Sequence, residues 1–172
     1  APTASTTAQL AMGDALAVAL LDARGFKADD FARSHPGGAL GRRLLTHVSD
    51  VMRSGDAVPR VMPQAALMDL MREISAKGLG AGAVVDEQGL PVGIFTDGDL
   101  RRLLDDDAID LRATPIAEVM GRSPKTIGPD RLASEAAHLM QEHQVSGLLV
   151  ADAEGRLVGA LNIHDLLRAR VV

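Results

Sequence analysis

Residues 93–100, Gly-Ile-Phe-Thr-Asp-Gly-Asp-Leu, decide the fold because their pattern returns at residues 159–166 as Gly-Ala-Leu-Asn-Ile-His-Asp-Leu. In both stretches a short apolar run enters a polar step and continues as a predicted helix. The first residue of each polar step, Thr96 or Asn162, is of a type that caps helix N-termini. The chain therefore contains an internal repeat in which a strand leads directly into a helix.

The repeat can be followed from Val48 to the end of the chain. Each copy opens on Val-Met, at residues 51–52 and 119–120, and continues with a short apolar piece. An amphipathic helix follows, and then two strands joined by a tight turn, so each copy predicts the order strand, helix, strand, strand, helix. The helix stripes are expected to be core: Leu67, Leu70, Met71 and Ile74 in the first copy, and Leu132, Ala136, Leu139 and Met140 in the second. The paired strands are expected at 83–85 and 92–95, and at 147–151 and 157–161.

Composition limits the function classes. The 172 residues, 47% of them hydrophobic, suffice for one or two domains with a sizeable core. The absence of cysteine excludes a disulfide framework, a thiolate metal site and a cysteine nucleophile. A net charge of −5, with three Phe and no Trp or Tyr, argues against a nucleic-acid surface. We find no apolar run of about 18 residues and no leader, so we expect a soluble cytoplasmic protein without a membrane partner.

The first 47 residues lie outside the repeat. Residues 8–24 predict a helix that ends at Gly25, and this helix is apolar nearly all round. A helix without a polar face is typical of a buried helix, and the rest of this short segment cannot cover it. We therefore expect that the chain is a fragment, and that a missing partner domain or another subunit covers the helix.

His35 is expected on a tight loop, because Pro36 disfavours helical backbone before it and two glycines follow. A surface histidine and a catalytic acid or base both remain open interpretations from the residues alone. For a metal we find no converging ligands: the acidic run at 105–107 is interpreted as a solvated linker, and His138 and His143 do not share a helix face. No metal site is expected.

The polar steps support two competing interpretations. A capping residue followed three positions later by an acid is close to a capping box, which needs no ligand. Alternatively, free N–H groups at the helix N-terminus bind phosphate while the acid accepts hydrogen bonds from a vicinal diol. Two such steps face to face would line a cleft for a nucleotide or a sugar. The candidate ligand-binding residues are Thr96, Asp97, Asp99, Asn162, His164 and Asp165.

Of the two acids, we expect Asp165 to matter more than Asp99 for an anionic sugar ligand. The reason is that His164 precedes Asp165, whereas Gly98, which is poorer in donors, precedes Asp99.

The two copies resemble the tandem CBS domain pair, an α/β (α+β) fold, over residues 48–113 and 114–172. The resemblance implies a pseudo-twofold disc with a ligand cleft between the copies. Members that bind nucleotides usually carry Ser or Thr just before the final acid, where this chain has Gly98 and His164. This departure disfavours an adenine nucleotide.

Residues 1–47 resemble the end of the sugar-isomerase (SIS) domain of D-arabinose 5-phosphate isomerases, in the stretches 1–7, 12–17 and 31–41. Those enzymes join this domain to a CBS pair and interconvert the sugar phosphates D-arabinose 5-phosphate and D-ribulose 5-phosphate. Their reaction supplies the pathway to Kdo, an acidic sugar of lipopolysaccharide. The resemblance implies that His35 is a catalytic residue. The other catalytic residues would lie upstream of Ala1, so this chain alone is expected to be inactive.

For the CBS pair the resemblance implies regulation without a required cofactor, in a homo-oligomeric enzyme. The leading hypothesis is a sensor of a nucleotide-activated sugar such as CMP-Kdo. The ribose of CMP-Kdo would meet Asp99 or Asp165, and its phosphate would meet Thr96 or Asn162. Its carboxylate would meet His164. Two alternatives stay open: a sensor of adenine nucleotides, and an oligomerisation module in which both polar steps are only caps.

Overall fold

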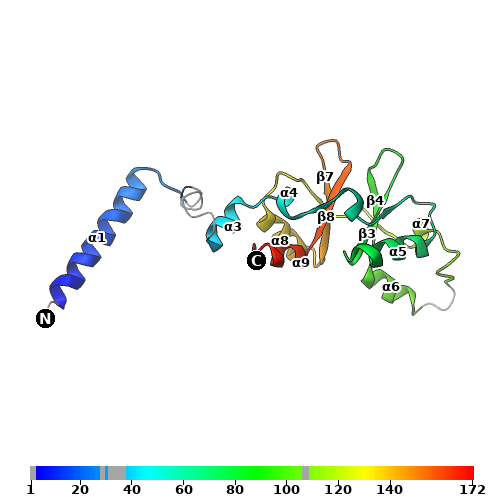
Figure 1. Cartoon of the computed structure of the whole chain (residues 1–172), viewed down its shortest axis with the longest axis horizontal. Helices are drawn as coiled ribbons and strands as arrows, with labels where there is room; N and C mark the ends of the chain where they lie inside the picture. Colours follow the sequence, from blue (N-terminus) through cyan, green and yellow to red (C-terminus); the bar gives the residue numbers. More distant parts are fainter. Residues whose placement is uncertain (1–2, 28–29, 31–37, 106–108) are drawn as a thin grey trace. The chain divides into compact units, whose positions relative to one another are not determined.

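The structure is a computed structural model that describes residues 3–27, 30, 38–105 and 109–172. It contains two compact units, Ala1–Leu45 and Thr46–Val172. In the first unit, helix α1 spans Ala4–Ala23 and helix α3 spans Ala39–Leu45 (Figure 1). Gly25 has a φ of 63°, a left-handed conformation that glycine adopts without a Cβ penalty. The predicted helix and its glycine end are confirmed.

Helix α1 is apolar and exposed. Its large side chains are open to solvent, with Leu10 71% and Met12 73% exposed. Among the described residues, α1 is the one helix that is long and apolar enough to cross a membrane, judged by length and composition. The expectation that no segment reaches that length was therefore wrong. The core helix of a larger soluble protein meets the same criterion, so the finding does not by itself indicate a membrane.

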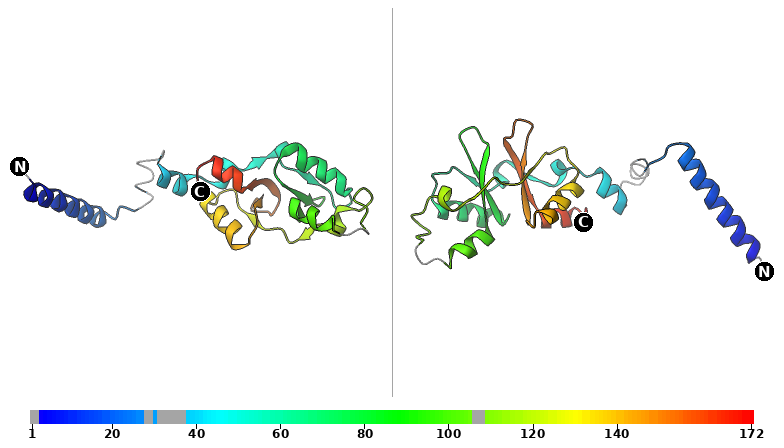
Figure 2. Two further views of the ribbon diagram at one scale, coloured as in Figure 1. Left: turned by 90° about the horizontal axis from the view of Figure 1, so that it is seen from below. Right: turned by 180° about the vertical axis from the view of Figure 1, so that it is seen from behind.

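The second unit contains two four-stranded sheets, which Figure 2 shows from two further sides. The first sheet has the order β2 (Arg60–Val61), β3 (Ala81–Val85), β4 (Pro91–Thr96) and β5 (Gly121–Arg122). The second has the order β1 (Arg53–Ser54), β8 (Leu157–Asn162), β7 (Gly147–Ala151) and β6 (Thr126–Ile127).

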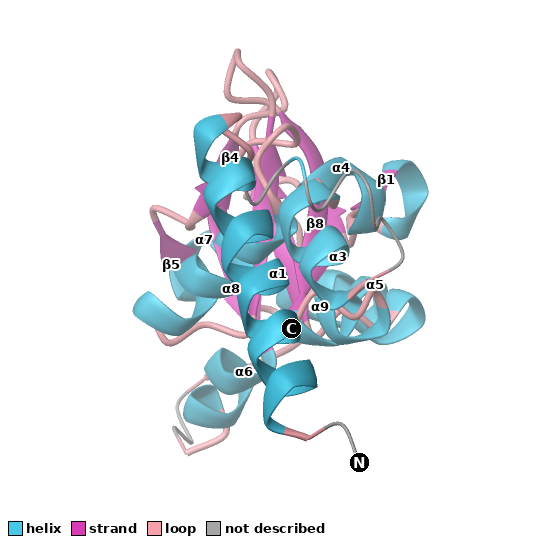
Figure 3. Cartoon of the chain, turned by 90° about the vertical axis from the view of Figure 1, so that its left-hand side faces the viewer, coloured by secondary structure: helices cyan, strands magenta, loops and turns pink. Residues whose placement is uncertain are grey.

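Helices flank both sheets (Figure 3). The first sheet carries α5 (Leu67–Lys77) and α6 (Asp97–Leu103), and the second carries α8 (Ala133–Glu142) and α9 (Ile163–Arg168). Short helical turns lie in the opening segments of the copies: α4 (Val48–Val51), η1 (Gly55–Ala57) and α7 (Ile116–Val119). The predicted order of strand, helix, strand, strand, helix is confirmed in both copies.

The opening segment of each copy packs on the other copy. Strand β1 pairs with β8, and β5 pairs with β4, so each sheet receives one of its two edge strands from the opposite copy. The same exchange occurs in the cores, because Val48 of α4 is buried in the second copy and Ile116 of α7 in the first. The sequence did not predict this exchange, since hydrophobic periodicity identifies strands but not their neighbours. The two copies are interlocked.

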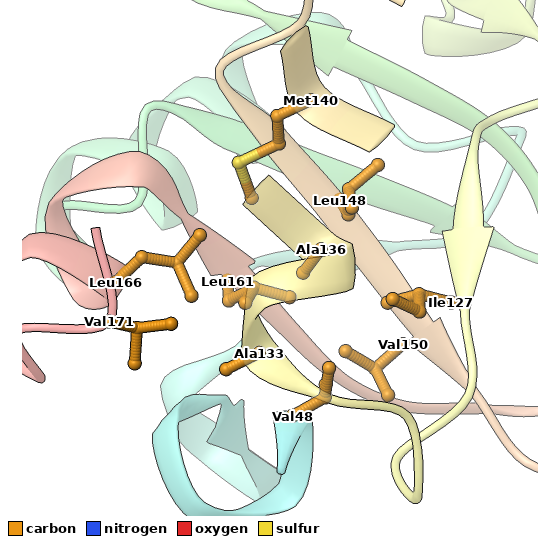
Figure 4. Close-up of a cluster of buried hydrophobic side chains, with 10 residues drawn as sticks. All are labelled: Val48, Ile127, Ala133, Ala136, Met140, Leu148, Val150, Leu161, Leu166 and Val171. Carbon is orange, nitrogen blue, oxygen red and sulfur yellow. The ribbon is translucent and has the colours of Figure 1, made fainter. Parts of the chain in front are cut away.

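Most residues of the predicted helix stripes lie in the two cores, whereas Leu132 precedes α8 and is only partly buried. Leu67, Leu70 and Ile74 are at most 4% exposed, and Ala136 and Met140 at most 3%. Figure 4 shows the core of the second copy, in which side chains from three strands and three helices meet: Val48, Ile127, Ala133, Ala136, Met140, Leu148, Val150, Leu161, Leu166 and Val171. A third cluster joins the copies: Val58, Leu79, Ala83, Leu149 and Ala160.

The glycine that opens each repeated motif makes room for a methionine of the exchanged segment. A Cβ on Gly93 would lie 2.2 Å from the sulfur of Met120, and a Cβ on Gly159 would lie 2.5 Å from the sulfur of Met52. Real Cβ atoms essentially never approach so closely. The two methionines that open the copies therefore pack directly against the two glycines of the motif, in space that a side chain at either glycine would need.

Candidate ligand-binding cleft

Both polar steps are capping boxes. The Thr96 hydroxyl accepts a hydrogen bond from the Asp99 amide at 3.3 Å, and the Asp99 carboxylate accepts from the Thr96 amide at 2.8 Å. In the second copy the Asn162 side-chain oxygen accepts from the Asp165 amide, and the Asp165 carboxylate accepts from the Asn162 amide, both at 3.1 Å. The N-terminal ends of α6 and α9 are thereby fixed, and the predicted capping boxes are present at both sites.

A cleft of about 970 Å³ opens between the two copies, within the second unit. Its lining includes five of the six predicted ligand-binding residues: Thr96, Asp97, Asp99, Asn162 and His164. Asp165 is not among the described residues that line it. The predicted catalytic residue, His35, lies outside the described residues.

Further polar residues line the cleft that the sequence did not single out: Ser123, Lys125, Gln144 and Ser146. They lie on the connections before β6 and β7, which are parallel neighbours, while β8 runs antiparallel to β7 and ends at the polar step. The starts of β6 and β7 therefore meet the end of β8 at one edge of the sheet. Strand direction could have placed these residues beside the polar step.

The charges in the cleft are mixed. The lining includes three cationic side chains, Lys125, Arg101 and Arg102, and the imidazole of His164. It also includes the carboxylates of Asp97 and Asp99. Cations and hydroxyls suit an anionic group, and carboxylates suit hydroxyl donors. The lining can therefore bind a molecule that carries both a diol and a negative charge.

Asp99 is placed so that it can exchange its partner for a ligand. One carboxylate oxygen accepts from the Thr96 amide and hydroxyl, and the other pairs with Arg102. The Arg102 side chain is 74% exposed, and exposed ion pairs contribute only about 0–1 kcal/mol. Replacing this arginine by ligand hydroxyls costs little.

Asp165 is in a different environment, because its side chain is only 4% exposed and is held by Arg53. The Arg53 Nη2 atom donates to Asp165 Oδ1 at 3.1 Å, and Nε lies 3.2 and 3.3 Å from the two carboxylate oxygens. The side chain of Asn162 also has a partner inside the protein, since its Nδ2 atom donates to the Leu79 carbonyl at 3.0 Å. This acid serves a structural ion pair between the copies.

The described residues contain no group of three or more histidines, aspartates and glutamates that could hold a metal ion.

The exchanged strands, the paired helices and the cleft define the class of protein. Residues 48–106 and 116–172 match the CBS domain, and the chain belongs to this family. Solved structures share the fold. CBSX2 in complex with AMP superimposes with a TM-score of 0.62 at 26% identity, over 72% of this chain and 95% of that one. The CBS pair of protein MJ0100 in complex with 5-methylthioadenosine and S-adenosyl-L-methionine gives 0.63 at 25% identity, over 72% and 94%.

In sequence the chain is similar to arabinose 5-phosphate isomerases. It is 55% identical over all 172 residues to KdsD of Pseudomonas aeruginosa and 53% identical to KdsD of Escherichia coli K12. The chain covers 52% of each of these proteins, so it spans about half the length of the curated relatives it matches.

Proposed function

We propose that this chain is part of an arabinose 5-phosphate isomerase, comprising the end of the SIS domain at residues 1–47 and a regulatory CBS pair at 48–113 and 114–172. The observation that carries the proposal is an identity of 53–55% over the whole chain, the first 47 residues included. The whole enzyme would interconvert D-arabinose 5-phosphate and D-ribulose 5-phosphate in the cytoplasm, on the path to Kdo and lipopolysaccharide.

Catalysis would belong to the full-length enzyme. Aldose–ketose exchange moves a proton between adjacent carbons and needs a positioned acid and base, a role that we assign to His35 with residues preceding this chain. The isomerase assay on the full-length protein, with this chain alone as the comparison, tests the assignment. Turnover by the 172-residue chain itself would contradict it.

The exposure of α1 supports the assignment of residues 1–47 to a larger domain. Side chains such as Leu10, Met12 and Val18 are 65–73% exposed here, and each square ångström of apolar surface in water costs about 25 cal/mol. The remainder of a SIS domain, or a second subunit of a homo-oligomer, would cover this helix. With either the rest of the SIS domain or a second subunit packed on it, α1 would be a core helix of a soluble enzyme.

For the CBS pair we assign the cleft to an anionic nucleotide or nucleotide-sugar effector such as CMP-Kdo. Asp99 would accept hydrogen bonds from ribose hydroxyls, the capped end of α6 with Thr96 and Asp97 would lie beside the sugar, and Lys125 and His164 would meet phosphate or carboxylate. The cleft volume of about 970 Å³ suits a ligand of this size. The bound AMP and S-adenosyl-L-methionine in the CBS-pair structures support a nucleotide-type ligand.

Two other functions have an observation in their favour. An adenine nucleotide is favoured by the ligands of the solved CBS pairs, although Gly98 stands where a hydroxyl would be expected. An oligomerisation module without a ligand is favoured by the capping boxes, which satisfy both polar steps internally.

A thermal-shift panel of CMP-Kdo, CMP, AMP and ATP separates the three. A ligand at a hundred times its dissociation constant stabilises the folded state by about 2.7 kcal/mol, a rise in melting temperature of roughly 5–10 °C for a protein of this size. We expect the largest rise with CMP-Kdo. A larger rise with AMP or ATP would establish the adenine-nucleotide sensor, and no rise with any of the four would leave the oligomerisation module.

A further inference from the structure

The two pseudo-symmetric halves of the pair differ at one equivalent position. Arg53 of β1 lies opposite Ala160 of β8, and Gly121 of β5 lies opposite Ile94 of β4. Ile94 and Ala160 are the second residues of the two copies of the repeated motif. The strand register therefore makes Arg53 and Gly121 equivalent, with a long cationic side chain in one half and no side chain in the other.

In the half that contains Asp165, Arg53 fills the space beside the acid. In addition to its contacts with Asp165, the guanidinium donates through Nη1 to the Lys77 carbonyl at 2.6 Å. Lys77 is the last residue of α5, where backbone carbonyls lack helical partners and a cation is favoured. One side chain thus satisfies both the acid and the helix end, and Arg53 is itself only 20% exposed.

In the half that contains Asp99, Gly121 leaves the equivalent space open. Gly121 lines the cleft together with Ser123 and Lys125, whereas Arg53 does not line it within the described residues. A Cβ at Gly121 would lie 3.4 Å from the Ile94 carbonyl oxygen, which is an ordinary contact. The position can therefore accept a side chain without distorting the strand.

The arginine that follows each acid does not explain the difference. Arg102 pairs with Asp99, and Arg168 occupies the same position relative to Asp165, with its Nη1 atom 3.7 Å from the carboxylate. Both of these arginines are about three-quarters exposed. The asymmetry between an open and a closed acid therefore lies in Arg53 and Gly121.

We propose that the pair binds one effector per chain, at Asp99, and that Arg53 is a built-in occupant that keeps the equivalent site at Asp165 closed. The ligand class is a molecule with a vicinal diol for Asp99 and an anionic group for Lys125. The inference rests on the proposed function for the nature of this ligand, but the difference between the two halves stands without it.

The proposal is tested by introducing an arginine at position 121, the equivalent of Arg53 in the open half. Gly121→Arg gives the open half the residue that closes the other, and His138→Arg adds the same charge on an exposed face of α8 outside the cleft lining. Calorimetric titration with CMP and with AMP should show one site per chain in the wild type. Gly121→Arg should weaken that binding by at least roughly 10-fold, as expected for loss of hydrogen bonds to a charged group, and His138→Arg should not. Two sites per chain, or unchanged affinity in Gly121→Arg, would overturn the proposal.

A second arm needs no ligand and covers the case in which neither nucleotide binds. If Gly121 is equivalent to Arg53, then Gly121→Arg forms an ion pair with Asp99 and raises the melting temperature more in the wild-type background than in the Asp99→Asn background. Such coupling with no bound nucleotide would support the built-in occupant while the proposed ligand class fails. Equal shifts in the two backgrounds would overturn the equivalence itself.

Discussion

Replacing Arg53 by methionine should destabilise the chain by about 3 kcal/mol. Methionine keeps an unbranched chain but removes the charge, so the Asp165 carboxylate loses its mostly buried cationic partner and the Lys77 carbonyl loses the guanidinium donor. Breaking a buried ion pair from one side costs roughly 3–5 kcal/mol, and we take the lower end because the Arg53 side chain is 20% exposed. Urea unfolding followed by circular dichroism measures the change.

Two further variants decide whether this cost comes from an orphaned charge. In the double variant Arg53→Met with Asp165→Asn no charge remains buried, so most of the lost stability should return. Arg102→Met removes the exposed partner of Asp99 and should cost no more than about 1 kcal/mol. If Arg53→Met costs as little as Arg102→Met, or if the double variant is less stable than Arg53→Met alone, the structural role of this ion pair is refuted.

The remaining predictions concern the acids, the motif glycine, the first unit and catalysis. Asp99→Asn should weaken effector binding by roughly 10- to 100-fold in a titration and cost little stability, whereas Asp165→Asn should mainly lower the melting temperature; similar affinity losses in both would contradict the assignment. Gly159→Ala should destabilise by roughly 1–3 kcal/mol because its Cβ meets the sulfur of a methionine, and shortening that methionine to alanine in the same protein should recover part of the loss. The chain should self-associate through α1 in sedimentation velocity, and an ordered monomer with that helix exposed would argue against a missing cover. In the full-length enzyme His35→Ala should abolish most turnover while circular dichroism stays unchanged, and wild-type turnover would return His35 to a surface role.

The helices and strands of the CBS pair could be predicted because the pattern of each element occurs twice in the chain. The stripe containing Leu67, Leu70 and Ile74 has helical spacing, and the polar step that begins at Thr96 has the spacing of a cap, so local chemistry was enough. The exchange of β1 and β5 could not be predicted in this way. Periodicity states which face of a strand is buried but carries no information on which strand lies beside it.

The different surroundings of the two acids could not be predicted from the sequence for the same reason. The order of apolar, capping and acidic residues is the same around Asp99 and Asp165, and we expected Asp165 to matter more because His164 precedes it. We propose Asp99 instead, because Arg53 already holds the buried Asp165 carboxylate. Arg53 lies 112 positions from Asp165 in the chain. This contact forms because β1, which carries Arg53, pairs with β8 of the other copy, and that pairing is known only from the assembled sheets.

The most direct test of the account is a calorimetric titration of this chain with CMP-Kdo, run in parallel on Asp99→Asn. We predict saturable binding of one molecule per chain in the wild type and an affinity reduced by roughly 10- to 100-fold in the variant. The absence of binding to the folded wild-type chain, or an equal affinity in Asp99→Asn, would contradict the assignment of the cleft as an effector site.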